Sequence, residues 1–135
     1  IESVDSLRLA NAISKRSEEL DTVTPILMEV NIGGEEAKSG VSPEALEELL
    51  YQIAPLKGVS VQGLMTIPPI CDDERLLNEY FSKMHRIFID IKAKKLDNVD
   101  MTVLSMGMSS DYEAAIWNGS TLVRVGTALF GKRIY

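Results

Sequence analysis

Short, β-branched apolar segments alternate with amphipathic segments along the chain, and this alternation constrains the fold more than any other feature. Strands are predicted at residues 26–32, 59–67, 101–106 and 121–125, and helices at 6–20, 43–53, 73–91, 111–118 and 127–131. Parallel neighbours need a crossover connection, and right-handed crossovers place helices on a sheet face. The chain is therefore predicted to be an α/β protein with a parallel sheet. An open doubly wound sheet and part of a (β/α)8 TIM barrel both fit this order.

The composition indicates one domain over residues 1–135, because 45% hydrophobic and 25% charged residues are typical of a single globular unit. The chain opens on Ile1 rather than Met, and Ile1 to Val4 resembles the tail of a strand. We therefore expect a fragment or a trimmed product.

The charge pattern argues against two classes of partner. A net charge of −6 without a Lys/Arg block does not suit a nucleic-acid surface. No apolar stretch reaches the roughly 20 residues that a membrane-spanning helix needs, so we expect no membrane partner and a cytoplasmic protein. Cys71 and His85 are the only Cys and His, which excludes an internal disulfide and gives no metal motif.

Two consecutive strand ends share one pattern, a glycine followed by a hydroxyl residue and a predicted helix start. These are the segments Leu104–Asp111 and Val123–Gly131. Unpaired backbone N–H groups at such a turn, with glycine for close approach, can bind an anion. In a TIM barrel, the loops after the last two strands commonly bind phosphate. The pair of turns therefore predicts a phosphate site.

Arg124 stands between Val123 and Val125 in the last predicted strand, so it points to the opposite face from both valines. If the valines face the helices, the arginine faces the barrel interior. It could contact a ligand there, or form a structural ion pair with Glu29, because a buried charge is costly unless it is paired. The sequence leaves both interpretations open.

No residue is a convincing nucleophile or general base, and we predict no catalytic or metal-binding residue. The lysines fall in loops or on polar helix faces, and none is inside a strand: Lys38, Lys57, Lys83, Lys92, Lys94, Lys95 and Lys132. The acidic segment Gly33–Gly40 lacks the patterns of a calcium loop or a P-loop, so it is predicted to be a surface loop. Polar positions within two strands are expected to pack in the barrel interior: Glu29, Asn31, Gln62 and Thr66.

Five motifs in order resemble the pyridoxal phosphate homeostasis family, also called the YggS/PROSC or alanine-racemase-like family. They are IESVDSL at 1–7, EVNIGGEEAKSG at 29–40, GLMTIPP at 63–69, LSMGMSSDYEAAI at 104–116 and VRVGTALFG at 123–131. The resemblance covers essentially the whole chain. It implies the C-terminal portion of a fold-type III barrel that binds pyridoxal 5'-phosphate (PLP), with strands five to eight and their helices.

The resemblance also implies the cofactor contacts. The residues at the cofactor phosphate would be Ser105, Gly107, Met108 and Ser109, with backbone N–H groups of Gly126 and Thr127. Arg124 would face the pyridine nitrogen. A guanidinium stays protonated, so it donates to this nitrogen and leaves the ring a weaker electron sink. This favours a carrier over an enzyme.

The family's Schiff-base lysine lies on an early strand that precedes the region present here. The resemblance therefore implies a non-catalytic PLP carrier or regulator whose covalent lysine is outside this chain, and we expect no turnover from the chain itself. The alternative is a PLP-dependent amino-acid racemase of the alanine racemase class, which needs a second acid/base such as a tyrosine. Only Tyr112 follows a strand end closely. A half barrel would expose sheet edges and an apolar face, so self-association of the chain is a further expectation.

Overall fold

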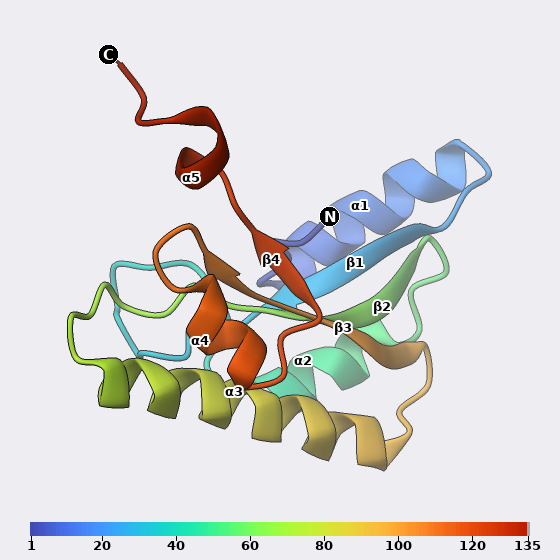
Figure 1. Cartoon of the computed structure of the whole chain (residues 1–135). Coiled ribbons are helices and arrows are strands. Elements are labelled where there is room, and N and C mark those ends of the chain that lie inside the picture. The colour runs from blue at the N-terminus through green and yellow to red at the C-terminus, as the bar shows by residue number, and fades with distance from the viewer. Residues whose placement is uncertain (135) are drawn as a thin grey trace.

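A computed structural model describes residues 1–134 of the chain. Its strands are β1 (Thr24–Glu29), β2 (Val59–Met65), β3 (Val99–Met108) and β4 (Leu122–Arg124). Its helices are α1 (Leu7–Glu19), α2 (Leu46–Ile53), α3 (Glu74–Lys94), α4 (Tyr112–Trp117) and α5 (Thr127–Phe130). The predicted alternation of strands and helices is confirmed (Figure 1).

The four strands form one parallel sheet in the order β1-β2-β3-β4. The N-terminal residues extend this sheet past β1, because Val4 forms a parallel bridge with Met28. The Leu27 N–H donates to the Ile1 carbonyl at 2.8 Å, and the Glu29 N–H donates to the Val4 carbonyl at 2.8 Å. The prediction that Ile1 to Val4 continues a strand is therefore confirmed.

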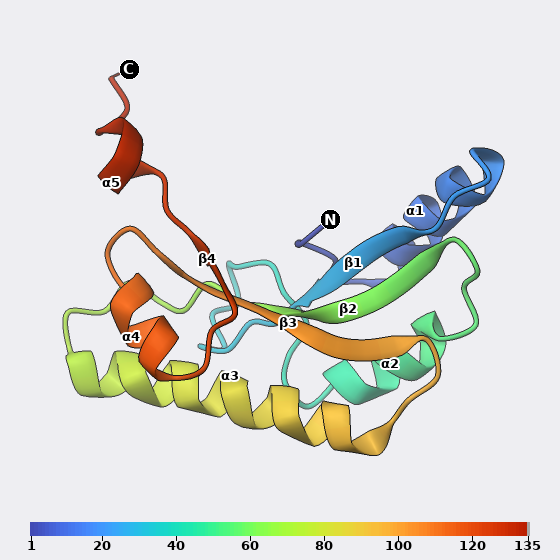
Figure 2. The same cartoon turned by 45° about the vertical axis from the view of Figure 1, so that its right-hand side comes forward.

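One face of the sheet packs against α1, α2, α3 and α4. The buried hydrophobic core combines Ile26, Val61 and Leu104 of the strands with Ala10 of α1 and Phe81 of α3. Figure 2 shows the sheet curving, with α2, α3 and α4 along the same side. A doubly wound sheet would carry helices on both faces. Helices on one face of a curved parallel sheet therefore define a partial barrel.

The opposite, concave face carries side chains that are outside this core cluster. Leu27, Glu29, Met65 and Ser105 are buried there. Ser105 stands between Leu104 and Met106 of the core in the same strand, and alternate residues of a strand point to opposite faces. Figure 1 shows β4 continuing into α5, which projects away from the other helices. No residue of α5 is buried.

Several helices begin or end at caps that lie close to the predicted helix ends. Ser6 is the N-cap of α1, where its Oγ accepts from the Leu9 N–H at 3.2 Å. Asp73 is the N-cap of α3 and accepts from the Arg75 N–H at 2.9 Å. Gly119 follows α4 with a φ of +94°, a left-handed conformation that glycine adopts readily after a helix.

Several predicted boundaries differ from the structure; β3, for example, runs from Val99 to Met108 rather than from residue 101 to residue 106. Two of these differences have a clear local cause. The helix predicted from Pro43 begins at Leu46, because residues 43–45 form a turn in which the Ser42 carbonyl accepts from the Ala45 N–H at 3.1 Å. The strand predicted to reach Ile32 ends at Glu29, because Val30 instead pairs with Val41 of the following loop in an isolated bridge.

Candidate functional site

The turns after β3 and β4 meet at Ser109. The Ser109 Oγ accepts hydrogen bonds from the Gly126 N–H at 3.1 Å and from the Ala128 N–H at 3.2 Å. The two strand ends singled out in the sequence therefore converge, as parallel neighbours should. An oxygen atom already lies between two backbone donors at this place, which is the geometry that one phosphate oxygen would use.

Gly107, near the end of β3, and Gly126, after β4, differ in how much space a side chain would have at each position. A Cβ on Gly107 would lie 2.6 Å from the Ala115 Cβ, and Gly107 has a φ of +100°, so this glycine allows β3 to approach α4 closely. A Cβ on Gly126 would meet nothing within 4 Å. The open space for close approach to a backbone is therefore at Gly126.

The backbone N–H groups of Met108 and Thr127 differ in whether they already have a hydrogen-bond acceptor. The Met108 N–H donates to Asp111 Oδ1 at 2.6 Å, so this donor is already used within the turn. Thr127 is exposed, and within residues 1–134 its N–H has no hydrogen-bond acceptor. The Thr127 N–H is therefore available to a ligand beside Gly126.

Arg124 reaches across the concave face to two neighbouring strands. Its Nη1 donates to the Ser105 Oγ, and its Nη2 donates to the Thr66 carbonyl at 3.1 Å. Ser105, fully buried, in turn donates its hydroxyl proton to Glu2 Oε2 at 3.0 Å. The arginine is thus fixed by oxygen acceptors on the face where the sequence predicted the barrel interior.

The ion pair between Arg124 and Glu29 that the sequence left open is not formed. Among residues 1–134, no carboxylate lies within ion-pair distance of Arg124. Burial lowers the pKa of Arg124, and the charges of Glu2, Asp111 and Glu29 oppose this decrease. A guanidinium nevertheless stays protonated at neutral pH, so Arg124 is a permanent donor.

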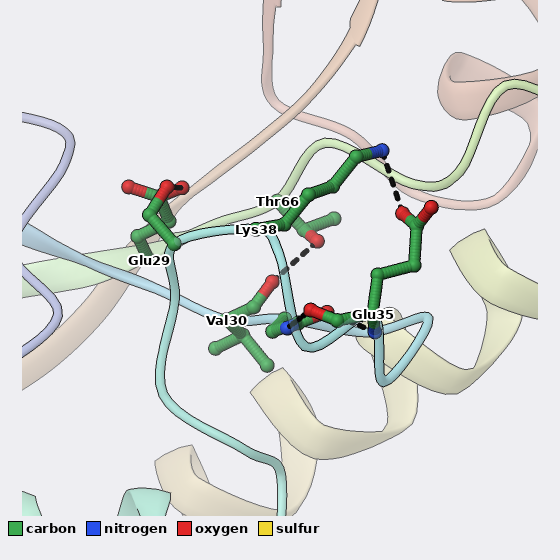
Figure 3. Close-up of polar contacts among 7 residues, drawn as sticks. Glu29, Val30, Glu35, Lys38 and Thr66 are labelled. Carbon is green, nitrogen blue, oxygen red and sulfur yellow. Dashed lines mark hydrogen bonds and ion pairs between the residues drawn. The ribbon is translucent and has the colours of Figure 1, made fainter.

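The loop that follows β1 is ordered by its own polar contacts, as Figure 3 shows. Glu29, 9% exposed, accepts from the Ser39 hydroxyl at 2.6 Å. Lys38 Nζ lies 2.7 Å from Glu35 Oε2, and the Thr66 hydroxyl donates to the Val30 carbonyl at 2.7 Å. Glu29 is therefore held by its own loop and does not pair with Arg124.

An open cleft of about 620 Å³ lies beside these turns, between the start of α3 and the start of α4. Its lining includes Ser109 but also the carboxylates of Asp72, Glu74, Asp111 and Glu113. This acidic lining would repel a phosphate, so the cleft does not fit the predicted ligand. Within residues 1–134, no cluster of three or more His, Cys, Asp or Glu side chains could hold a metal ion, and no helix there is long and apolar enough to cross a membrane.

The partial barrel agrees with a comparison of the sequence with known families. Residues 1–133 match the family described as alanine racemase, N-terminal domain. The chain belongs to this family.

Among individual relatives, the pyridoxal phosphate homeostasis protein of Aquifex aeolicus is 45% identical over all 135 residues of the chain. The chain spans 58% of that protein's length. The structure of PipY from Synechococcus elongatus without PLP has a TM-score of 0.89 and 33% identity, covering 97% of this chain and 60% of PipY. PipY with PLP bound has a TM-score of 0.85 and 31% identity over the same shares.

Glu2 is the member of the concave-face network that the sequence analysis did not select. Its sequence signal was a charged residue within the otherwise strand-like tail at Ile1 to Val4. Thr66 was expected to pack in the interior, and its carbonyl contact with Arg124 is a backbone contact that no side-chain pattern could indicate.

Proposed function

We propose that this chain contributes the phosphate and ring contacts of a PLP-binding protein that stores and delivers the cofactor in the cytoplasm. Two comparisons support this proposal: a relative with 45% identity is named a pyridoxal phosphate homeostasis protein, and a structural neighbour with 31% identity is described with PLP bound. In this proposal the chain is the C-terminal part of a barrel, and the covalent lysine belongs to the remainder.

The observation that carries the proposal is the convergence of two backbone turns on one oxygen atom. The Gly126 and Ala128 N–H groups already bind the Ser109 hydroxyl, and Gly126 leaves its Cβ position open. These are features that a phosphate monoester needs, because it is bound by several N–H donors at close range. The residues proposed to form the cofactor site, by direct contact or by positioning a contacting residue, are Ser105, Gly107, Met108, Ser109, Arg124, Gly126 and Thr127.

The proposed roles follow from the contacts. The Thr127 N–H and the Ser109 hydroxyl would bind the phosphate directly, and the Gly126 N–H would exchange its present bond to the Ser109 Oγ for one to a phosphate oxygen. Gly107 and Met108 would shape the end of β3 that presents Ser109. Ser105 acts through Arg124, which donates to the ring nitrogen. PLP itself supplies an aldehyde and a conjugated ring. A charged arginine donates to the nitrogen without transferring its proton, which suits storage better than amino-acid chemistry.

The test is to titrate PLP into a full-length protein that contains this chain and to record the absorbance of the bound cofactor. Reduction with borohydride should then fix the cofactor to one lysine that lies outside residues 1–135. The absence of a cofactor absorbance band would contradict the proposal, and fixation on a lysine within the chain would contradict the proposed division of the site.

If the same protein racemised alanine, it would be an enzyme and not only a carrier. The tyrosine singled out for this role does not favour it. The Tyr112 hydroxyl lies 3.4 Å from Glu113 Oε1 in an exposed hydrogen bond on α4. Among the contacts of residues 1–134, none directs the Tyr112 hydroxyl toward Arg124. We propose no nucleic-acid or membrane partner, and we propose that the isolated chain associates with itself.

A further inference from the structure

Glu2, Ser105 and Arg124 form a chain of hydrogen bonds on the concave face. Arg124 donates to the Ser105 Oγ, and the Ser105 hydroxyl donates to Glu2 Oε2 at 3.0 Å. The three residues come from the N-terminal segment, β3 and β4, so the contact between Glu2 and Ser105 spans 103 positions of sequence. Only the folded sheet brings them together.

The donors and acceptors among Arg124, Ser105 and Glu2 fix the direction of each hydrogen bond. A serine hydroxyl has a single proton to donate, a carboxylate can only accept, and a guanidinium can only donate. Because Ser105 gives its proton to Glu2, its lone pairs face Arg124. Without Glu2, the hydroxyl of Ser105 could rotate and point its proton toward other acceptors, and the orientation of the guanidinium would no longer be fixed on that side.

The other hydrogen bond of Arg124 does not replace its contact with Ser105. Its Nη2 donates to the Thr66 carbonyl at 3.1 Å, which fixes the other nitrogen of the guanidinium. Two anchors define the plane of the guanidinium, whereas one leaves it free to turn about that contact. The guanidinium has more N–H donors than these two contacts use, so a donor remains for a ligand. The charge of Glu2 also opposes the effect of burial on the pKa of Arg124.

We propose that Glu2 is a positioning residue that acts through Ser105 to aim Arg124 at a ring-nitrogen acceptor on the concave face. It thereby selects phosphate monoesters that carry such a ring over inorganic phosphate. This proposal rests on the proposed function. It assigns Glu2 to recognition of the ring and leaves recognition of the phosphate to Ser109 and Gly126.

The test compares two ligands in the full-length protein. In Glu2→Ala, PLP affinity is expected to fall about tenfold, which corresponds to one charge-assisted hydrogen bond in a buried network. The absorbance maximum of bound PLP is expected to shift, because the contact to the ring changes. The affinity for inorganic phosphate, measured by its competition with PLP, is expected to stay unchanged. A merely structural role would weaken both ligands equally, and that result would overturn the proposal.

A double-mutant cycle tests whether Glu2 acts through Ser105. Ser105→Ala is expected to weaken PLP binding as Glu2→Ala does, and the double variant is expected to be no weaker than either. If the losses of PLP affinity in the two single variants were fully additive in the double variant, Glu2 would not act through Ser105. Glu2→Gln retains an acceptor oxygen and is expected to bind PLP within about threefold of the parent, as a preserved hydrogen bond predicts. A Glu2→Gln variant as weak as Glu2→Ala would also overturn the proposal.

The matched control is Glu18→Ala. Glu18 Oε1 accepts from the Ser14 hydroxyl at 2.9 Å, so this substitution removes the same kind of contact within α1. Its PLP affinity and absorbance are expected to match the parent. Should Glu2→Ala fail to fold, Glu2→Gln and Ser105→Ala carry the same comparison.

Different outcomes test PLP binding by the protein and the role of Glu2 separately. If the parent protein fails to bind PLP, the proposed function fails and the role of Glu2 fails with it. If the parent binds PLP and Glu2→Ala changes neither affinity nor absorbance, only the role of Glu2 is overturned.

Discussion

Gly63 lies where the backbones of β2 and β3 leave no room for a side chain. A Cβ at this position would lie 1.8 Å from the Val103 carbonyl oxygen, which belongs to the backbone and cannot rotate away. Gly63→Ala is therefore expected to lower the free energy of unfolding by about 3 kcal/mol, the upper end for overpacking, or to prevent folding. Urea denaturation followed by circular dichroism measures this effect.

Gly34 offers the comparison for Gly63. It has a φ of +67°, but its Cβ position meets nothing within 4 Å, so Gly34→Ala adds only backbone strain. This substitution is expected to cost about 1 kcal/mol. Equal losses in the two variants would show that the close approach at Gly63 is relieved by movement of β3.

Gly126 is the glycine where stability and binding should separate. Its φ of −117° suits alanine, and nothing lies within 4 Å of its Cβ position. Gly126→Ala is expected to leave the melting temperature of the full-length protein unchanged. A methyl group in this space would keep the phosphate from the backbone, so PLP affinity is expected to fall about tenfold or more, as for loss of a charge-assisted hydrogen bond. Calorimetric titration measures this, and unchanged affinity would remove Gly126 from the site.

At the scale of single elements, α3 depends on its N-cap. Asp73 accepts from the Arg75 N–H at 2.9 Å and begins a helix of 21 residues. Asp73→Ala is expected to lower the free energy of unfolding by about 1 kcal/mol. The control is Asp72→Ala, because the Asp72 side chain is exposed and makes no hydrogen bond within residues 1–134. A loss of similar size in both variants would contradict the capping role.

The elements could be predicted because their signals are local. Caps at Ser6 and Asp73 and the β-branched content of the strands depend on neighbours in sequence. The start of α2 could not be predicted, because a proline at 43 is compatible with both a helix and the turn that is formed. The end of β1 at Glu29 could not either, since it is set by pairing of Val30 with a loop residue.

In the candidate site too, some features could be predicted from the sequence and others could not. Convergence of the β3 and β4 turns at Ser109 follows from the parallel order of consecutive strands, so the sequence predicted it. The partners of Arg124 did not follow from the sequence, which offered Glu29 as its ion-pair partner, expected Thr66 to pack in the interior and implied Ser105 at the phosphate. The choice among them depends on strand register, which shifts between β3 and β4. Glu2 was missed because its contact is entirely tertiary.

At the scale of the whole molecule, the two sides of the sheet are stabilised unequally. The helix-covered side holds the hydrophobic core, and the β1 edge is covered by the segment containing Val4. Within residues 1–134, β4 pairs with β3 alone, so its outer edge is open. An open edge of a parallel sheet presents backbone donors and acceptors to any other strand.

The segment that follows β4 in sequence carries exposed apolar side chains. Leu129 is 72% exposed and Phe130 87% exposed on α5, and Ile134 is 99% exposed beyond it. An open strand edge together with exposed apolar residues favours association. We therefore expect the isolated 135-residue chain to self-associate, with a sedimentation coefficient that increases with concentration.

The site of association can be located by matched substitutions. Phe130→Gln removes an exposed aromatic residue in the segment that follows β4, whereas Ile70→Gln removes a fully exposed apolar residue in the loop between β2 and α3. Phe130→Gln is expected to shift the association toward the monomer, and Ile70→Gln is expected to leave it unchanged. A chain that stays monomeric at all concentrations would contradict the expectation itself, while an equal effect of both substitutions would place the contact away from β4. Because the same edge borders Arg124, association through it should also reduce binding of inorganic phosphate at high protein concentration.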